Sequence, residues 1–145
     1  MSKILIGGHE ITVHKDYSTS EVFTGQYWID GKKIYRKVFT GTIPTLTANT
    51  SSVIILDASF TPSAATVLSY SGFVDISTSQ RVILPQTGGQ PTVISGTTYL
   101  ICPAYVWCDQ YTGGLRLIIL VMNATQVTAY SGKSFTLSFE YTKTE

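Results

Sequence analysis

The strongest fold signal in the chain is QYWIDGKKIYRKVF, residues 26–39. Aromatic and β-branched residues lie on both sides of Asp30-Gly31, a dipeptide typical of the type I′ turn, in which both central residues have positive φ. We therefore predict a β-hairpin with a two-residue turn. Its second arm carries lysine or arginine on both faces, which predicts an edge or partly exposed strand, because lysines discourage edge-to-edge pairing.

The rest of the chain also has the pattern of β structure. Short runs of β-branched and aromatic residues are separated by Gly, Pro, Asn, Asp and Ser, and long helical periodicity is absent. We expect an all-β fold, an antiparallel β-sandwich that is jelly-roll-like and has no significant helix. Further strands are predicted at residues 4–5, 10–14, 52–56, 66–71, 72–76, 80–84, 92–94, 98–107, 115–122, 125–130 and 134–142, and loops at 40–50, 59–64 and 85–91.

Two of these strands have the clearest hydrophobic pattern. Residues 115–122 are apolar on nearly every side, which predicts a central strand covered on both faces. Residues 134–142 alternate between apolar and polar, which is typical of a sheet with one face in the core. The expected core-facing residues of this last strand are Phe135, Leu137, Phe139 and Tyr141.

Composition and charge exclude several classes of protein. A chain of 145 residues is the size of one domain with a single core. The charged fraction is 13% and the net charge is +1, so we expect neither a nucleic-acid partner nor binding to an anionic membrane. The longest apolar stretch is far shorter than the ~20 residues of a membrane helix, and the first residues lack the pattern of a signal peptide. We expect synthesis and folding in a cytosol, without membrane insertion.

The first sixteen residues form a separable N-terminal arm, residues 1–16, and residues 17–145 form the sandwich domain. Gly7-Gly8 gives the arm a hinge, and its two short strands could pair with a neighbouring chain as readily as with the domain's own sheet. The arm also holds His9 and His14, the two histidines of the chain. Because residues five positions apart on a strand point to opposite faces, these histidines do not predict a metal site.

Catalytic, metal and cofactor chemistry has little support in the sequence. No histidine outside the arm is available to activate a serine or cysteine nucleophile. Cys102 and Cys108 match no zinc or redox spacing, and on one extended strand they would lie too far apart for a disulfide, so we expect free, mostly buried thiols. Glycine patterns that bind phosphates or dinucleotides are missing. We therefore predict no catalytic residue, no metal and no cofactor.

A glycoside hydrolase is the main enzymatic alternative, because it needs only two carboxylates. The candidate acids outside the arm are Glu21, Asp30, Asp57, Asp75, Asp109 and Glu140. Asp30 belongs to the hairpin turn, and Asp57 and Asp75 lie at strand ends, where aspartate commonly bonds to nearby backbone. Asp109 has aromatic neighbours, and a lone acid in such a setting is more typical of a sugar-binding subsite than of a hydrolytic one.

The candidate ligand-binding residues lie together near the end of one predicted strand: Trp107, Asp109, Gln110 and Tyr111. Aromatic faces stack on sugar rings, and amides and carboxylates bond to sugar hydroxyls. The alternative is that the aromatic residues belong to the core or to a subunit interface. Both interpretations stay open for these four residues, whereas Tyr99 and Tyr105 fit packing better.

Three short motifs carry a resemblance to a known family. They are YSTSE at residues 17–21, the hairpin motif WIDGKKIYRK at 28–37, and EYTKT at 140–144. Together they resemble a domain found, typically at the C-terminus, in tail-fibre and minor structural proteins of bacteriophages. In that family such motifs bracket a variable, β-rich middle.

This resemblance implies a virion protein with a β-sandwich fold that assembles as a homotrimer. It implies structural roles for the motif residues, with Asp30 and Gly31 in the turn and Trp28, Tyr35 and Tyr141 in packing. The family's domain often ends a long fibre, whereas sixteen residues precede it here. The domain is therefore either a small virion component docked by its arm or a piece of a longer chain.

The leading hypothesis is a non-enzymatic bacteriophage virion structural protein, a fibre, head-fibre or decoration module. It would be made in the host bacterial cytoplasm, oligomerise through its sheet faces and attach to other virion proteins through its arm. It would also contact the host cell surface, with glycans as the candidate ligand. The alternatives are a purely architectural capsid or tail assembly protein, and a polysaccharide depolymerase that loses activity on Asp109→Asn.

Overall fold

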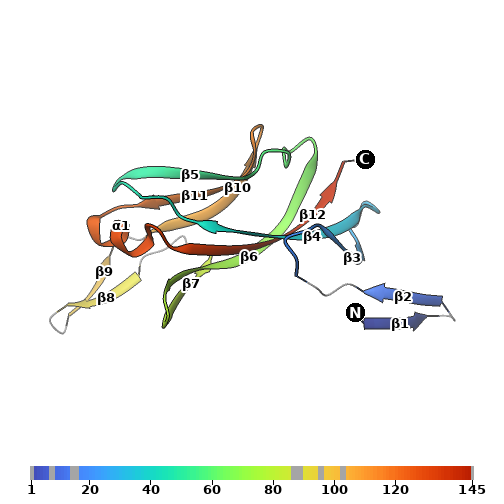
Figure 1. The fold of residues 1–145 in the computed structure, drawn as a ribbon, viewed down its shortest axis with the longest axis horizontal. Helices are drawn as coiled ribbons and strands as arrows, with labels where there is room; N and C mark the ends of the chain where they lie inside the picture. The colour runs from blue at the N-terminus through green and yellow to red at the C-terminus, as the bar shows by residue number, and fades with distance from the viewer. Residues whose placement is uncertain are drawn as a thin grey trace.

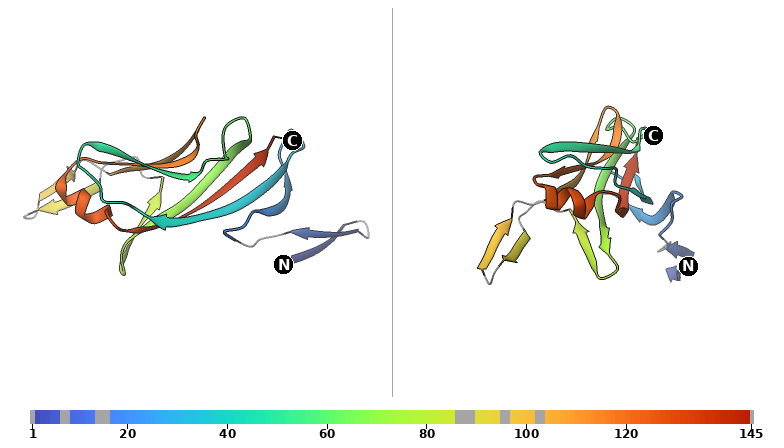
Figure 2. Two further views of the ribbon diagram at one scale, coloured as in Figure 1. Left: turned by 45° about the horizontal axis from the view of Figure 1, so that its top comes forward. Right: turned by 60° about the vertical axis from the view of Figure 1, so that its left-hand side comes forward.

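The structure is a computed structural model that describes residues 2–6, 9–13, 17–85, 90–94, 97–101 and 104–144, with side chains described for 17–85 and 104–144. Two antiparallel β-sheets pack face to face, as Figures 1 and 2 show. Buried residues from both sheets form one hydrophobic cluster between them. The predicted all-β sandwich is confirmed.

The larger sheet has five strands in the order β3-β4-β12-β6-β7. Their bounds are β3 Val22–Tyr27, β4 Lys33–Thr42, β12 Ser134–Lys143, β6 Ala65–Ser77 and β7 Gln80–Leu84. The smaller sheet has the order β10-β11-β5, with β10 Tyr105–Tyr111, β11 Gly114–Val121 and β5 Thr50–Asp57. Two separate strand pairs complete the described fold: β1 Ser2–Ile6 with β2 His9–Val13, and β8 Gln90–Ile94 with β9 Thr97–Ile101.

The core-facing pattern of β12 is confirmed. Phe135, Leu137, Phe139 and Tyr141 are at most 3% exposed. They point from the middle of the five-stranded sheet toward the buried face of β11. Alternation of apolar and polar residues therefore identified the inner face of this strand correctly.

The predicted central strand at 115–122 is β11, the middle strand of the smaller sheet. Its core-facing side chains are fully buried, and Ile118 on the outer face is only 6% exposed. Arg116 and Leu120 on that outer face are half-buried. β11 is thus fully covered on its inner face, as expected, but only partly covered on its outer face.

The predicted hairpin exists as β3 and β4, but its turn differs from the prediction. The loop has three residues, Ile29 to Gly31, and Gly31 adopts a φ of 84° whereas Asp30 has no positive φ. The N–H of Gly31 donates to the carbonyl of Trp28 at 2.9 Å, and Asp30 accepts from the backbone of Lys32 at 3.0 Å. This is the turn with one left-handed residue that three-residue hairpins favour.

The second arm of the hairpin is not an edge strand, because β4 lies between β3 and β12. Its mixed pattern has another cause. Lys37 points inward at the end of the sandwich, where it meets Asp57 at 3.3 Å. A charged residue on the inner face therefore reflects an ion pair at the rim of the core.

A helix replaces the strand predicted at 125–130. Helix α1, Ala124–Tyr130, begins after Asn123, whose side chain accepts a hydrogen bond from the N–H of Gln126 at 2.9 Å. Tyr130 at its end is buried in the core. The prediction of a strand at 125–130 is therefore wrong, because the Asn123 N-cap stabilises a helix although several residues of the segment are β-branched. This helix has seven residues, and the all-β class is unchanged.

Two strand boundaries also differ from the prediction. Residues 66–71 and 72–76 belong to one strand, β6. The strand is continuous because Gly72, at the predicted break, pairs with Leu137 of β12. A side chain at Gly72 would lie within 2.9 Å of the Leu137 Cα, so glycine permits the close approach of the strands. Conversely, the strand predicted at 98–107 is two strands, β9 and β10.

The two arm strands β1 and β2 pair with each other, Ser2 opposite Val13. Whether the arm separates from the sandwich stays a prediction. The loop predicted at 59–64 is present between β5 and β6, whereas part of the loop predicted at 85–91 lies outside the described residues. In the described part of the chain no helix has the length and apolar character to span a membrane.

Candidate functional site

The four residues predicted to bind a ligand lie on β10, but they do not share one face. Trp107, Asp109 and Tyr111 point to the outer side of the three-stranded sheet, opposite to the core-facing Val106. Gln110 points inward, toward the loop between β5 and β6. Strand geometry alone separates Gln110 from the other three.

The side chain of Gln110 is used within the protein. Its Nε2 donates to the carbonyls of Phe60 at 3.1 Å and Ala65 at 3.0 Å, and its Oε1 accepts from the N–H of Val67 at 3.0 Å. Both amide hydrogens are therefore taken by backbone groups. These bonds fasten the loop to β10 and favour a structural role for Gln110.

Asp109 is also paired. The guanidinium of Arg116, directly opposite on β11, donates from Nε and Nη2 to the two carboxylate oxygens at 2.5 and 2.9 Å. The same guanidinium lies 4.2 Å from the centroid of the Tyr111 ring. Both carboxylate oxygens of Asp109 therefore accept hydrogen bonds from the same guanidinium, which makes Asp109 poorly suited to act as a catalytic acid.

Cys108 lies between Trp107 and Asp109 on β10, and its side chain faces the core. Burial, with a smaller effect from the charge of Asp109, raises the pKa of its thiol to about 12. The thiol is free, in agreement with the prediction for this cysteine. Cys102 lies outside the described residues.

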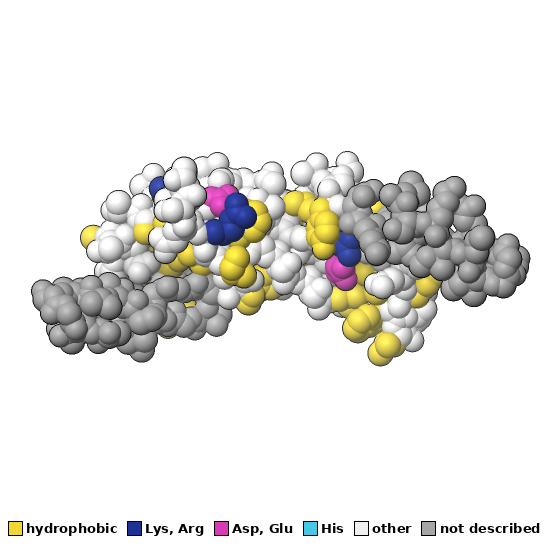
Figure 3. Space-filling view, turned by 90° about the horizontal axis from the view of Figure 1, so that it is seen from below, with side chains coloured by type: hydrophobic (Ala, Val, Ile, Leu, Met, Phe, Trp, Pro, Cys, Tyr) yellow, Lys and Arg dark blue, Asp and Glu magenta, His cyan; other side chains and the backbone are white. Residues whose placement is uncertain are grey.

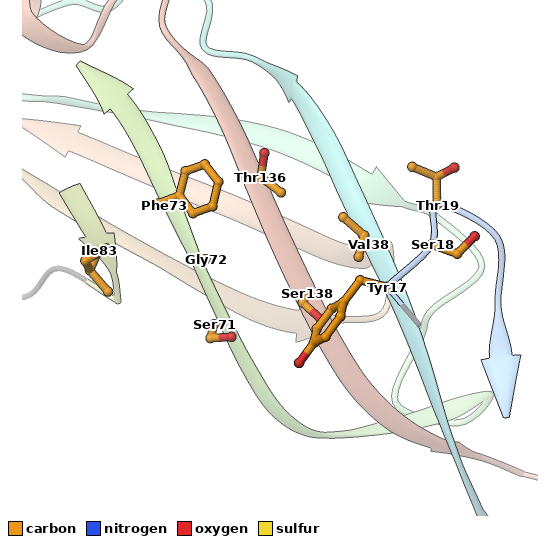
Figure 4. A pocket seen from close by; sticks show the side chains of 10 residues that line it. All are labelled: Tyr17, Ser18, Thr19, Val38, Ser71, Gly72, Phe73, Ile83, Thr136 and Ser138. Atoms are coloured by element: carbon orange, nitrogen blue, oxygen red, sulfur yellow. The ribbon is translucent and has the colours of Figure 1, made fainter. Parts of the chain in front are cut away.

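The largest described hollow lies elsewhere, on the outer face of the five-stranded sheet, and we call it the outer-face groove. Figure 4 shows Tyr17 on one side of it and Phe73 and Ile83 on the other. Its volume is about 490 Å³. The lining residues are Tyr17, Ser18, Thr19, Val38, Ser71, Gly72, Phe73, Ile83, Thr136 and Ser138.

Tyr17 is held over the sheet by two contacts. The carbonyl of Ser18 accepts from the N–H of Val38 at 2.8 Å, which fixes the segment alongside β4. The guanidinium carbon of Arg36 lies 4.6 Å from the Tyr17 ring centroid, and Arg36 pairs with Glu140 at 2.7 Å. Tyr17 is nevertheless 69% exposed, so most of its side chain is accessible.

The opposite side of the groove repeats this arrangement. The guanidinium carbon of Arg81 lies 3.8 Å from the centroid of the Phe73 ring, and its Nε pairs with Asp75 at 2.6 Å. Figure 3, which views the molecule from below Figure 1, shows two such groups of charged and hydrophobic side chains with uncharged polar surface between them. The rings of Tyr17 and Phe73 thus each lie against a guanidinium whose charge is paired with a carboxylate.

A smaller hollow of about 300 Å³ at the end of the sandwich holds charged residues. It brings together Glu21 and Asp57, two of the acids considered for a hydrolase, but each is paired with a lysine, Lys143 and Lys37 respectively. Burial raises the pKa of Asp57, yet hydrogen bonds from Ser59 and the charge of Lys37 outweigh this effect and lower the pKa overall. A general acid needs the opposite shift.

The three motifs that carry the family resemblance meet at one corner of the five-stranded sheet, which we call the motif corner. Glu21 accepts from the hydroxyl of Tyr141 at 2.5 Å and pairs with Lys143. The ammonium of Lys143 lies 4.5 Å from the centroid of the Tyr35 ring. Tyr17, Arg36 and Glu140 extend the same network.

The packing roles expected for the motif aromatics hold in part. Tyr141 is fully buried, and its ring lies 6.0 Å from that of Tyr35. Trp28 is 41% exposed at the hairpin, so the expectation that it packs is wrong. Its place directly after β3 and before the three-residue loop, at the outer end of the hairpin, accounts for the exposure.

Comparison of the chain with protein-family models, curated proteins and solved structures finds no match. The outer-face groove is absent from the sequence predictions, because its residues come from five separate segments. One signal for it was present: Thr136 and Ser138 alternate with core residues and so had to face outward. Their neighbours Ser71 and Phe73 follow only from the pairing of β6 with β12.

Proposed function

We propose that the protein is a non-enzymatic structural protein of a bacteriophage virion that oligomerises and contacts the host cell surface. The observation that carries this proposal is the motif corner. Motifs at 17–21, 34–37 and 140–144 contact one another through Glu21, Tyr141 and Lys143, although Glu21 and Lys143 are 122 positions apart in the sequence. The resemblance thus rests on residues that form a single structural unit.

The motif corner also fits the bracketing pattern of the family. It is built from the segment that leads into β3 and from the neighbouring strands β4 and β12 of the larger sheet. The segments between the motifs supply the smaller sheet and the strands β6 and β7. Such a division gives a fixed frame that can carry different surfaces, which suits a family of virion proteins with a variable middle.

Support for oligomerisation comes from the outer face of the three-stranded sheet. Val53 and Ile55 of β5 are 47% and 46% exposed, and Ile118 lies directly opposite Val53 on β11. Trp107 is opposite Ile118 on the far side. A row of apolar side chains across a sheet is typical of a surface that another protein covers. A purely architectural assembly protein would use the same row.

The first test is the molar mass in solution, measured by size-exclusion chromatography with light scattering. The full chain should have three times the 15.8 kDa mass of the monomer. A chain lacking residues 1–16 should remain a trimer, which leaves the arm available for attachment. Monomers in both cases would contradict the virion proposal most directly.

A further inference from the structure

The floor of the outer-face groove is a row of small hydroxyl side chains. Ser138 of β12 lies directly between Ser71 of β6 and Val38 of β4 in the strand register. Thr136 occupies the next outward position on β12 and pairs with Phe73. Ser71 and Ser138 are cross-strand partners, and Phe73 is the next outward residue on β6, about 6.6–7 Å further along, so the two serines form a low trough beside the larger Phe73.

These hydroxyls are available for a ligand. The side-chain hydrogen bonds of the described residues use none of the hydroxyls of Ser71, Thr136 and Ser138. A hydroxyl both donates and accepts, so a row of them matches a ligand that also carries hydroxyls. The groove therefore combines polar partners with apolar walls.

The two aromatic residues stand on opposite sides of this trough. Tyr17 and Phe73 each have one guanidinium against the ring, which limits the positions that the ring can take. Figure 4 shows β12, which carries Thr136 and Ser138, running between the segment of Tyr17 and β6, which carries Ser71 and Phe73. Aromatic faces of this kind can stack on the C–H faces of sugar rings.

None of the described residues that line the groove is charged. The nearest arginines are neutralised, Arg36 by Glu140 and Arg81 by Asp75. Among the described residues, an anionic ligand would thus meet no free cation in the groove, and a cationic ligand would meet no free carboxylate. The electrostatics favour an uncharged ligand.

We propose that the outer-face groove binds an uncharged saccharide. Tyr17 and Phe73 provide stacking surfaces, and Ser71, Thr136 and Ser138 bond to sugar hydroxyls. The proposal deepens the proposed function and rests on it, since it names the ligand class and the site of the host-surface contact. It places that site on the larger sheet, away from β10.

A second copy of the chain is the competing occupant. Among the large apolar side chains that the structure describes, Ile29 in the hairpin loop is the most exposed, at 94%. An apolar side chain in the groove would cover the three hydroxyls without bonding to them, and each unpaired buried hydroxyl costs about 1–3 kcal/mol. A saccharide satisfies both the apolar walls and the polar floor.

The test begins with the full chain on an array of uncharged and anionic oligosaccharides. The strongest uncharged binder is then titrated into the protein and followed by NMR. We expect shifts at residues 71–73 and 136–138, and an affinity that falls about tenfold in Tyr17→Ala, as expected for the loss of one stacking surface. Thr136→Val, which keeps the shape and removes the hydroxyl, should also weaken binding several-fold.

Tyr27→Ala is the matched control. Tyr27 is 60% exposed, close to the 69% of Tyr17, and it lies on β3 outside the groove. Its replacement should leave the affinity unchanged. Tyr17→Trp should retain binding, because it keeps an aromatic face at the same position.

Several outcomes would overturn the proposal. They are binding to anionic glycans alone, binding to none of the glycans, or affinity unchanged in both Tyr17→Ala and Thr136→Val. Loss of binding in Trp107→Ala with retention in Tyr17→Ala would move the ligand to β10 and also overturn it. A trimer that binds no glycan would contradict the groove proposal and leave the proposed structural role intact. A monomer that binds glycan would contradict the structural role and leave the groove proposal intact.

Discussion

Tyr141 joins the core to the motif corner, because its ring is buried while its hydroxyl donates to Glu21. Burial and then the Glu21 carboxylate raise the pKa of the phenol above its usual value of 10.0. The folded protein therefore keeps a proton that the unfolded chain releases above pH 10, so the free energy of unfolding must fall as the pH rises past that value. One such group contributes up to about 1.4 kcal/mol per pH unit.

We expect Tyr141→Phe to make this alkaline loss of stability less steep, measured by urea unfolding between pH 8 and pH 11.5. Burial also raises the pKa of Tyr70 and Tyr130, so part of the slope remains in the variant. At pH 8 the variant should be about 1–2 kcal/mol less stable, because Glu21 loses one donor but keeps Lys143. Identical slopes in the two proteins would contradict the role given to Tyr141.

Gln110 offers a second test at the residue scale. Gln110→Glu keeps an oxygen for the N–H of Val67 but has no hydrogens for the carbonyls of Phe60 and Ala65. We expect the free energy of unfolding at pH 8 to fall by roughly 2–3 kcal/mol. Gln26→Glu, at an exposed position on β3, should change it by less than about 0.5 kcal/mol. Equal effects of the two substitutions would show that the amide bonds do not matter.

Among the secondary-structure elements, helix α1 depends on its N-cap. It has seven residues, with no acidic residue in its first turn and no basic residue in its last, so the bond from Asn123 to the N–H of Gln126 is its main local support. Asn123→Ala should lower the free energy of unfolding by about 1 kcal/mol, measured by urea denaturation. Asn123→Asp, which keeps an acceptor, should be close to wild type. A stable Ala variant would mean that Tyr130 alone fixes the helix.

The elements also show how far sequence reasoning reaches. The alternation in β12 is a local pattern with one consistent interpretation, so its inner face could be predicted. Helix α1 could not, because Val127 and Thr128 favour strands and the cap that decides the matter is a single asparagine. The turn type at Asp30-Gly31 differed because the same dipeptide fits loops of two or three residues.

The candidate sites needed knowledge of which strands pair. Sequence proximity grouped Gln110 with Asp109, yet neighbouring residues on a strand face opposite ways. Tyr17 and Phe73 are 56 positions apart and come together only because β6, β12 and β4 are adjacent. Local patterns carry no information about that adjacency.

At the scale of the whole molecule, the two outer faces of the sandwich should have different tasks. If the three-stranded sheet forms the subunit interface, Val53→Lys and Ile55→Lys should reduce the molar mass in light scattering to that of the monomer. Both side chains are about half exposed, so the monomer should stay folded. Ile83→Lys, which is 66% exposed on the other sheet, should remain a trimer. The reverse result would place the interface over the outer-face groove.

The motif corner has a consequence for how such a domain spreads between genes. Glu21 and Lys143 hold the first and last strands of the sandwich together, so the chain enters and leaves it at neighbouring points. A unit with adjacent ends can be inserted into a surface loop of another protein without forcing the ends of that loop apart. Residues 17–144 therefore have the geometry of a transferable cassette, one that recombination can move intact while its outward surfaces diversify.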